Sequence, residues 1–174
     1  MSFAPEQRKE PSHADDIVIP TIAILEDNAE RRAVMERFLA THFSHCSRQY
    51  FTSSSAMVEW LRVNLSGVIF ISLDHDLELL PGEDGRMVDC GTGREVADFL
   101  ATQTAHCPVV IHSTNYPAAV GMEMALGDSG WTVETIAPYG DLEWIEEAWF
   151  PVVKKWIVPS KTSGIAPIHI PGVC

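Results

Sequence analysis

Basic residues are scarce in this 174-residue chain, which carries 12 Lys and Arg against 24 Asp and Glu and has a formal net charge of −12. Because proteins neutralise nucleic-acid phosphates with lysine and arginine, this composition argues against binding to duplex DNA. A small local basic spot could still contact a nucleotide or an RNA end. Long hydrophobic runs are also missing: the apolar stretches have only the length of strands, so no membrane span is expected.

The cysteines form neither a CxxC pair nor a Cys/His spacing typical of metal sites. They are widely spaced, at Cys46, Cys90, Cys107 and Cys174. We interpret them as free thiols in a reducing compartment. Residues 1–16 are polar, with charges of both signs, and lack the apolar stretch of a signal peptide, so a cytoplasmic location is expected.

The chain does contain enough apolar side chains for one packed core, with 46% hydrophobic residues. Short apolar segments alternate with segments of helical periodicity. The predicted strands are residues 21–25, 49–52, 68–73, 108–111 and 131–136. This alternation predicts a doubly wound α/β fold, in which a five-stranded parallel sheet of order 2-1-3-4-5 carries helices on both faces.

Local signals predict where helices and loops begin. The serine run that starts at Ser53 predicts an N-cap for the helix after the second strand. Residues 78–90 are rich in proline, glycine and acidic residues and are expected to form a loop. Pro151 should kink or divide the last helical segment, residues 141–158.

We expect a flexible N-terminal segment at residues 1–18, one domain at residues 19–158 and an extended tail at residues 159–174. The tail contains several isoleucines and is too apolar for a free linker, so we expect it to pack on the domain. Three tryptophans of the last segment cannot all face one way and could mark a homodimer surface, although core packing explains most of them. They are Trp144, Trp149 and Trp156.

Three of the predicted strands end in runs of polar side chains. The runs are Glu26-Asp27, Asp74-His75-Asp76 and His112-Ser113-Thr114-Asn115. In the predicted strand order these ends are neighbours at the topological switch point, so their side chains should meet in one crevice. Such groups are costly to bury without a compensating partner. Glu26, Asp27 and Asp74 would supply the oxygen ligands that Mg²⁺, or Mn²⁺ in its place, prefers.

Each run also has a purely structural interpretation. The acidic runs could cap the helix or loop that follows them. The histidines could face solvent or satisfy a backbone carbonyl in the core, and residues 113–115 are ordinary in a turn after a strand. The coincidence of three polar runs at neighbouring strand ends favours a functional site.

Residues 21–158, which contain these polar runs, resemble the receiver domain of bacterial response regulators, which has the flavodoxin-like fold of CheY. Residues 24–28 resemble the acidic pair that follows the first strand of that family. Asp74 falls where the family carries its phospho-accepting aspartate. Ser113 or Thr114 falls near the hydroxyl residue that contacts the phosphoryl group.

Two features depart from that family. Receivers place a lysine at the end of the fifth strand, where it pairs with the phosphoryl group, but residues 136–140 contain no lysine. The loop after the third strand is also longer than usual. The position that lends the metal a backbone carbonyl in receivers is occupied by Asp76.

The remaining motifs resemble a divergent branch, the cyclic-phosphate processing receiver-like domains. The shared motifs are Leu-Asp-His-Asp-Leu at residues 73–77, Thr-Gly at residues 92–93 and His-Ser-x-Asn at residues 112–115. This resemblance implies a metal-dependent phosphoesterase that acts on a cyclic or terminal phosphate of a nucleotide or an RNA end.

Under that hypothesis, Asp74 lies at the reacting centre and His75 or His112 acts as general acid or base, since imidazole titrates near neutral pH. Asp76 would orient His75 or add a metal ligand. The residues expected to hold the phosphate are Ser113, Thr114, Asn115 and Arg94. Of these, Arg94 would replace the positive charge of the missing lysine.

Two other functions remain open. The chain could be a signalling module in which Asp74 accepts a phosphoryl group and switches a protein partner, although the missing lysine counts against it. It could also be a pseudo-receiver that binds protein partners without metal or phosphate.

Overall fold

Five parallel strands form the central sheet of the computed structural model, which describes residues 19–82 and 85–157. The strands are β1 (Thr21–Leu25), β2 (Ser47–Phe51), β3 (Val68–Asp74), β6 (Val109–His112) and β7 (Val133–Ile136). Their order is β2-β1-β3-β6-β7, which confirms the predicted doubly wound fold and strand order. The predicted terminal segments, residues 1–18 and 159–174, lie outside the described residues.

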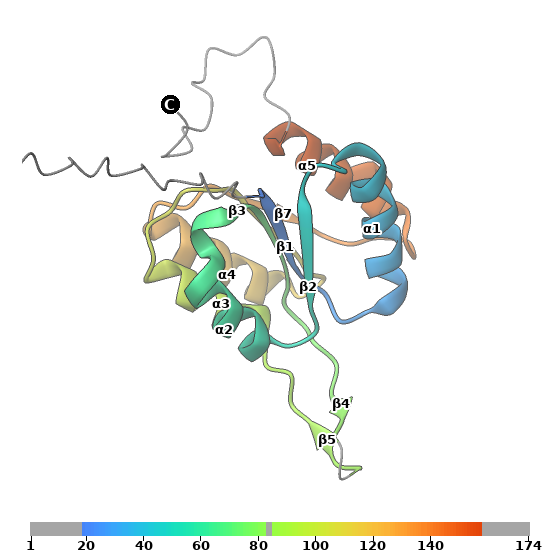
Figure 1. Ribbon diagram of the computed structural model, residues 1–174. Helices are drawn as coiled ribbons and strands as arrows, with labels where there is room; N and C mark the ends of the chain where they lie inside the picture. Colours follow the sequence, from blue (N-terminus) through green and yellow to red (C-terminus); the bar gives the residue numbers. More distant parts are fainter. Residues whose placement is uncertain (1–18, 83–84, 158–174) are drawn as a thin grey trace, which may run out of the picture.

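Helices cover both faces of this sheet (Figure 1). One layer contains α1 (Ala29–His42), the π-helical turn η2 (Ile145–Trp149) and α5 (Phe150–Ile157). The opposite layer contains α2 (Ser54–Asn64), α3 (Gly93–Ala101) and α4 (Tyr116–Asp128). A short 3-10 turn, η1 (Leu65–Gly67), leads into β3. None of the helices in the described ranges is long and apolar enough to cross a membrane.

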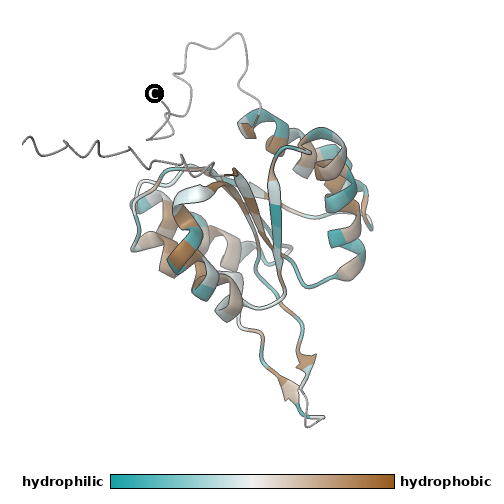
Figure 2. Cartoon of the chain, viewed as in Figure 1, coloured by the Kyte–Doolittle hydropathy of each residue, from teal (hydrophilic) through white to brown (hydrophobic). Residues whose placement is uncertain are grey.

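The alternation of side chains along β1 divides the core between the two layers. Ile22 and Ile24 pack into the cluster formed with α1, η2 and α5. Ala23 and Leu25 pack into the cluster formed with α2, α3 and α4. Apolar residues are accordingly concentrated in the strands between the helix layers (Figure 2). This two-sided burial explains why the strands are continuous apolar runs and why their ends are the first places where polar groups occur.

Side-chain caps fix where the helices begin. The side chain of Ser53 accepts a hydrogen bond from the N–H of Ala56, which confirms the predicted N-cap of α2. Asn28 caps α1 by accepting hydrogen bonds from the N–H groups of Glu30 and Arg31. Because Asn28 fills this role, the acidic pair before it is not used to cap α1.

Residues 78–90 differ from the predicted loop, because they contain a small antiparallel hairpin of β4 (Leu80–Pro81) and β5 (Met87–Val88). Gly85 has a φ of 77°, and its N–H donates to the carbonyl of Gly82, so a glycine supplies the conformation that the turn needs. The hairpin projects from the edge of the sheet at which β3 ends (Figure 1).

The last helical segment is divided next to Pro151, as predicted, by a π-helical turn. The N–H of Phe150 donates to the carbonyl of Ile145, so the turn takes in one residue more than an α-helical turn. This brings two tryptophans five positions apart, Trp144 and Trp149, into the same core cluster, and both are completely buried. The expectation that the tryptophans mark a homodimer surface is therefore wrong for these two, and the core-packing alternative holds.

Candidate functional site

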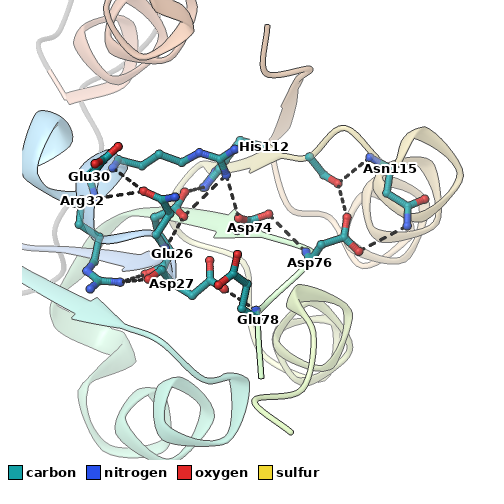
Figure 3. Close-up of polar contacts among 12 residues, drawn as sticks. Glu26, Asp27, Glu30, Arg32, Asp74, Asp76, Glu78, His112 and Asn115 are labelled. Atoms are coloured by element: carbon teal, nitrogen blue, oxygen red, sulfur yellow. Dashed lines mark hydrogen bonds and ion pairs between the residues drawn. The ribbon is translucent and has the colours of Figure 1, made fainter. Parts of the chain in front are cut away.

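The ends of β1, β3 and β6 lie side by side, which brings the three polar runs together. Asp74 pairs with His112 across β3 and β6, and Glu26 directly follows the last residue of β1, which is also paired to β3. In Figure 3, Asp74 lies between Glu26 and Asp76. The side chains at these strand ends meet at one edge of the sheet, which is the expected crevice.

A polar pocket of about 180 Å³ opens at this edge. It is lined by Asp27, Asn28, Arg31, Asp74, Asp76, Glu78, Ser113, Thr114 and Pro138. Four of these side chains are carboxylic acids and one is a cation, while proline is the one apolar member. Such a lining suits charged ligands, in contrast to the mostly apolar walls that surround typical organic ligands.

Glu26 lies completely buried beneath the pocket. Its Oε1 accepts a hydrogen bond of 2.9 Å from the backbone N–H of Asn28, and its Oε2 lies 3.2 Å from Nε2 of His112. Burial acts to raise the pKa of Glu26, but His112, the Asn28 N–H and the nearby Arg31 guanidinium outweigh it and lower the pKa overall. Glu26 is therefore held in its carboxylate form.

Asp74 forms the floor of the pocket and is 4% exposed. Burial raises the pKa of Asp74 to about 6, and the negative charges of Glu26 and Asp27 add to this effect. The opposing influences of His112 and Arg31 are too weak to reverse it. The carboxylates of Glu26 and Asp74 are thus buried next to that of Asp27, and the protein does not fully compensate their negative charge.

His112 belongs to a buried chain of hydrogen bonds beneath the site. The indole Nε1 of Trp149 donates to Oγ of Ser72 at 2.9 Å, and this oxygen lies 3.2 Å from Nδ1 of His112. Because an indole can only donate, Ser72 can direct its own hydrogen to Nδ1, which leaves the Nε2 hydrogen of His112 for Glu26. The ring of His112 also stacks on Trp144, with centroids 5.5 Å apart.

These contacts fix His112 away from the pocket. Its side chain has no exposed surface, and both of its ring nitrogens face partners within the protein. The expectation of a histidine that exchanges protons with a substrate therefore does not fit His112. Its contacts are those of a residue that positions the Glu26 carboxylate.

Arg31 is the cation in the pocket wall and was not among the residues expected from the sequence. Its Nη1 lies 3.5 Å from Oδ2 of Asp74 and 3.8 Å from Oε1 of Glu26. The guanidinium also lies over the ring of Trp144, 5.8 Å from its centroid. Its place in the first turn of the helix that follows Glu26 and Asp27 is the signal that could have revealed it.

Asp76 connects the motif after β3 with the motif after β6. Its Oδ2 lies 3.4 Å from the hydroxyl of Ser113, and its Oδ1 lies 3.5 Å from Nδ2 of Asn115. The Asp76 backbone N–H donates to Oδ1 of Asp74 at 3.3 Å. Thr114 lines the same pocket. The Asp-His-Asp and His-Ser-x-Asn runs therefore form one hydrogen-bonded unit.

The Thr-Gly motif has a packing role beside this unit. The N–H of Gly93 donates to the carbonyl of His75 at 3.1 Å, and Thr92 forms an isolated bridge with Asp76. A Cβ atom on Gly93 would lie 2.1 Å from the carbonyl oxygen of Asp74. Only glycine lets the start of α3 approach the end of β3 this closely.

The donor set fits a divalent cation. Within the described ranges, ligand atoms of Glu26, Asp74 and His112 lie within 4.8 Å of one another. Carboxylate oxygens are the ligands that hard cations prefer, and the uncompensated charge at Asp74 favours such a cation. Asp27, the third expected ligand, lines the pocket above them, where its Oδ2 accepts a hydrogen bond from the Glu78 N–H.

Two expected residues lie apart from this cluster. Nε of Arg94 contacts Oδ1 of Asp98 at 2.6 Å on the surface of α3, and Arg94 does not line the pocket. His75 also does not line it, although its Nε2 lies 3.8 Å from Oδ1 of Asp76. Nδ1 of His75 is buried and has no hydrogen-bond partner.

The family model described as the cyclic-phosphate processing Receiver domain matches residues 20–128, more than half of the chain. The matched range includes all the polar residues that line the pocket, together with Glu26 and His112. No curated protein sequence matches the chain significantly.

Solved structures with a similar fold are response regulators and their receiver domains. The phosphorylated cyanobacterial phytochrome response regulator RcpA aligns with a TM-score of 0.62 and 18% identity, over 81% of this chain and 96% of that one. The Mn²⁺-bound form of response regulator Rcp1 gives a TM-score of 0.60 and 15% identity over 81% and 96%. A receiver domain from Rhodospirillum rubrum gives 0.54 and 19% over 76% and 89%. At these identities the similarity shows the fold alone.

Proposed function

The chain belongs to the cyclic-phosphate processing receiver family, and from that premise we propose that its strand-end crevice is the site of a metal-dependent phosphoesterase. The proposed substrate is a cyclic or terminal phosphate of a nucleotide or an RNA end. Glu26, Asp27 and Asp74 would hold Mg²⁺ or Mn²⁺. When bound, this cation supplies positive charge that neutralises phosphate oxygens and orients the attacking water.

One observation carries this proposal: four carboxylic acid and two hydroxyl side chains line a single pocket beside a buried fifth carboxylate. The lining groups are Asp27, Asp74, Asp76, Glu78, Ser113 and Thr114, and the buried group is Glu26. The Mn²⁺-bound form of Rcp1, which has a similar fold, supports the choice of a divalent cation. The hydroxyl groups are suitable donors to phosphate oxygens.

The protein's own groups would handle the protons. In hydrolysis of a cyclic phosphate, the water oxygen bonds to phosphorus, one ester P–O bond breaks, and the released oxygen takes up a proton. Asp76 is suited to accept the proton of the water, because it lines the pocket and contacts Ser113 and Asn115. The same Asp76 carboxyl group can then return this proton to the released oxygen, while His75, with Nε2 3.8 Å from Asp76 but outside the pocket lining, would position Asp76.

The test is turnover of a 2′,3′-cyclic nucleotide, followed by phosphorus NMR in the presence of Mg²⁺ or Mn²⁺. We expect Asp74→Asn to reduce the rate by about 100-fold or more, the scale on which a reacting-centre group usually contributes. Asp128→Asn, the same substitution at an exposed position on α4, should leave the rate unchanged. Equal rates for wild type and Asp74→Asn, or equal rates with and without the metal, would disprove the proposal.

A signalling role is the second candidate, because Asp74 stands at the end of β3 and borders the pocket in a receiver fold. Against it, the pocket lining among the described residues contains no lysine. Incubation with a small phosphodonor, followed by mass spectrometry, distinguishes the two. A stoichiometric, hydroxylamine-labile phosphoryl group on Asp74 would favour signalling, and its absence with several donors would favour the phosphoesterase. A pseudo-receiver would instead show neither modification nor a response to metal.

A further inference from the structure

Of the described residues, one cationic side chain lines the pocket, and we propose that this residue, Arg31, is the group that binds the phosphate oxygens. The inference rests on the proposed function and assigns to Arg31 the role that receivers give to a lysine after the fifth strand. It differs from the expectation from the sequence, which placed that positive charge on Arg94.

The start of α1 determines where the Arg31 side chain leaves the backbone. Arg31 lies in the first turn of α1, and its N–H donates to Oδ1 of the N-cap Asn28 at 3.0 Å. The helix begins two residues after Asp27, so the side chain emerges at the same sheet edge as the strand-end carboxylates. It lines the pocket and is 30% exposed, which leaves it within reach of a ligand from solvent.

The guanidinium is held by two kinds of contact. Its Cζ lies over the ring of Trp144, which is itself completely buried. Both of its ion contacts, with Asp74 and Glu26, use Nη1 at 3.5 and 3.8 Å. A guanidinium carries five N–H donors in a planar fork that matches two phosphate oxygens, so contacts made through one nitrogen do not exhaust its capacity.

Charge balance predicts that phosphate binds to this pocket only together with a cation. Four carboxylic acid side chains line the pocket against one arginine, so an anion alone is repelled. A divalent cation at Glu26 and Asp74 would neutralise the two groups that contact Arg31, which frees the guanidinium to turn towards an anion. Metal and phosphate should therefore strengthen each other's binding.

The other cations of the described residues do not line the pocket, and Arg32, the next residue in the chain, uses its Nη1 to donate to the backbone carbonyls of Glu26 and Asp27. Arg94 is 2.6 Å from Asp98, and its Nη1 lies against Gly121 of α4. Lys155 is 2.6 Å from Glu134 of β7, and Lys154 lies over the ring of Phe150. None of these side chains lines the pocket.

The experiment measures binding by calorimetry, with Mg²⁺ alone and then with inorganic phosphate at saturating Mg²⁺. For Arg31→Gln we expect phosphate to bind at least 10-fold more weakly, while Mg²⁺ binds as well as to wild type or better, because a competing cation has been removed. Arg31→Lys should retain part of the phosphate affinity. Arg94→Gln is the matched control and should bind both ligands as wild type does.

The inference would be overturned by unchanged phosphate affinity in Arg31→Gln, by loss of phosphate binding in Arg94→Gln, or by a wild-type protein that binds no phosphate at saturating Mg²⁺. Weaker binding of both ligands in Arg31→Gln and Arg31→Lys would also overturn it, because that pattern means that Arg31 only holds the carboxylates in place. The proposed function is judged separately by turnover in Asp74→Asn. Retained turnover in Arg31→Gln with loss in Asp74→Asn would therefore contradict the role of Arg31 alone.

Discussion

Replacing Ser72 with alanine removes one hydroxyl group from the buried chain that links Trp149, His112 and Glu26. The hydroxyl oxygen accepts the indole N–H of Trp149 at 2.9 Å and lies 3.2 Å from Nδ1 of His112. All four side chains are completely buried, so no solvent can replace the missing partner. Alanine therefore leaves two polar groups unsatisfied without changing the charge of the site.

The expected loss of stability follows from those two groups. Each buried donor or acceptor left without a partner costs about 1–3 kcal/mol, so Ser72→Ala should destabilise the fold by about 2–6 kcal/mol. At about 2–4 °C per kcal/mol, this corresponds to a fall in melting temperature of roughly 4–24 °C. Because His112 then holds Glu26 less firmly, Mg²⁺ affinity should also fall by about 10-fold, as is typical when a partner of a ligand is removed.

A double-mutant cycle with Trp149→Phe, measured by urea unfolding, tests the mechanism. Phenylalanine removes the donor, so in that background Ser72→Ala should cost about 1–3 kcal/mol less than in wild type. Ser66→Ala, the same substitution at an exposed position, should change stability by less than about 0.5 kcal/mol. Additive effects in the cycle, or a Ser72→Ala protein as stable as Ser66→Ala, would refute the reasoning.

Two further predictions concern the edge of β3. Gly93→Ala should destabilise the fold by more than about 3 kcal/mol in urea unfolding, because the new Cβ would lie 2.1 Å from the Asp74 carbonyl. In contrast, Gly127→Ala on α4 meets no atom within 4 Å and should be neutral or stabilising by up to about 1 kcal/mol; equal effects of the two would contradict the close-approach argument. Burial raises the pKa of Asp74 to about 6 from an ordinary 3.8, so between these pH values the folded state retains a proton that the unfolded chain releases. The stability of the metal-free protein should therefore fall as the pH rises from about 4 to about 6. The same proton competes with a cation, so Mg²⁺ affinity should weaken below about pH 6. Asp74→Asn should remove the contribution of Asp74 to the dependence of stability on pH. An unchanged pH dependence in this variant would contradict the prediction.

The fold and the meeting of the strand ends were predictable because both follow from local patterns. Apolar runs of strand length define the buried sheet, and parallel strands must place their carboxyl ends at one edge. The polar residues that follow β1, β3 and β6 are therefore brought together by topology alone. That Glu26 and Asp74 lie close together could therefore be predicted from the strand order alone.

The roles of His112 and the arginines were not predictable in the same way. His112 stacks on Trp144 and is linked through Ser72 to Trp149, which lies in a π-helical turn 77 positions after Ser72. Proline at position 151 indicated an interruption but not that the turn would direct two tryptophans into one core cluster. Both Arg31 and Arg94 lie near the start of a helix, and only the three-dimensional direction of each side chain shows that Arg31 lines the pocket.

The hairpin within residues 78–90 was missed because its strands are only two residues long. So short a pairing carries no detectable alternation of apolar and polar residues. Gly85, with its positive φ, marks the position of the tight turn.

The most direct test of the central claim, that the crevice binds a divalent cation through its carboxylates, is a thermal titration of wild type and Asp74→Asn with Mg²⁺ and Mn²⁺ at pH 7.5. At a cation concentration of about 100 times Kd, linkage adds about 2.7 kcal/mol of stability, so the melting temperature of wild type should rise by roughly 5–10 °C. Without metal, Asp74→Asn should melt at the wild-type temperature or above it, because the substitution removes a carboxylate that burial and its neighbours disfavour. With metal, its melting temperature should stay the same. A wild-type protein whose melting temperature does not respond to either cation, or an Asp74→Asn variant that responds as fully as wild type, would contradict the account.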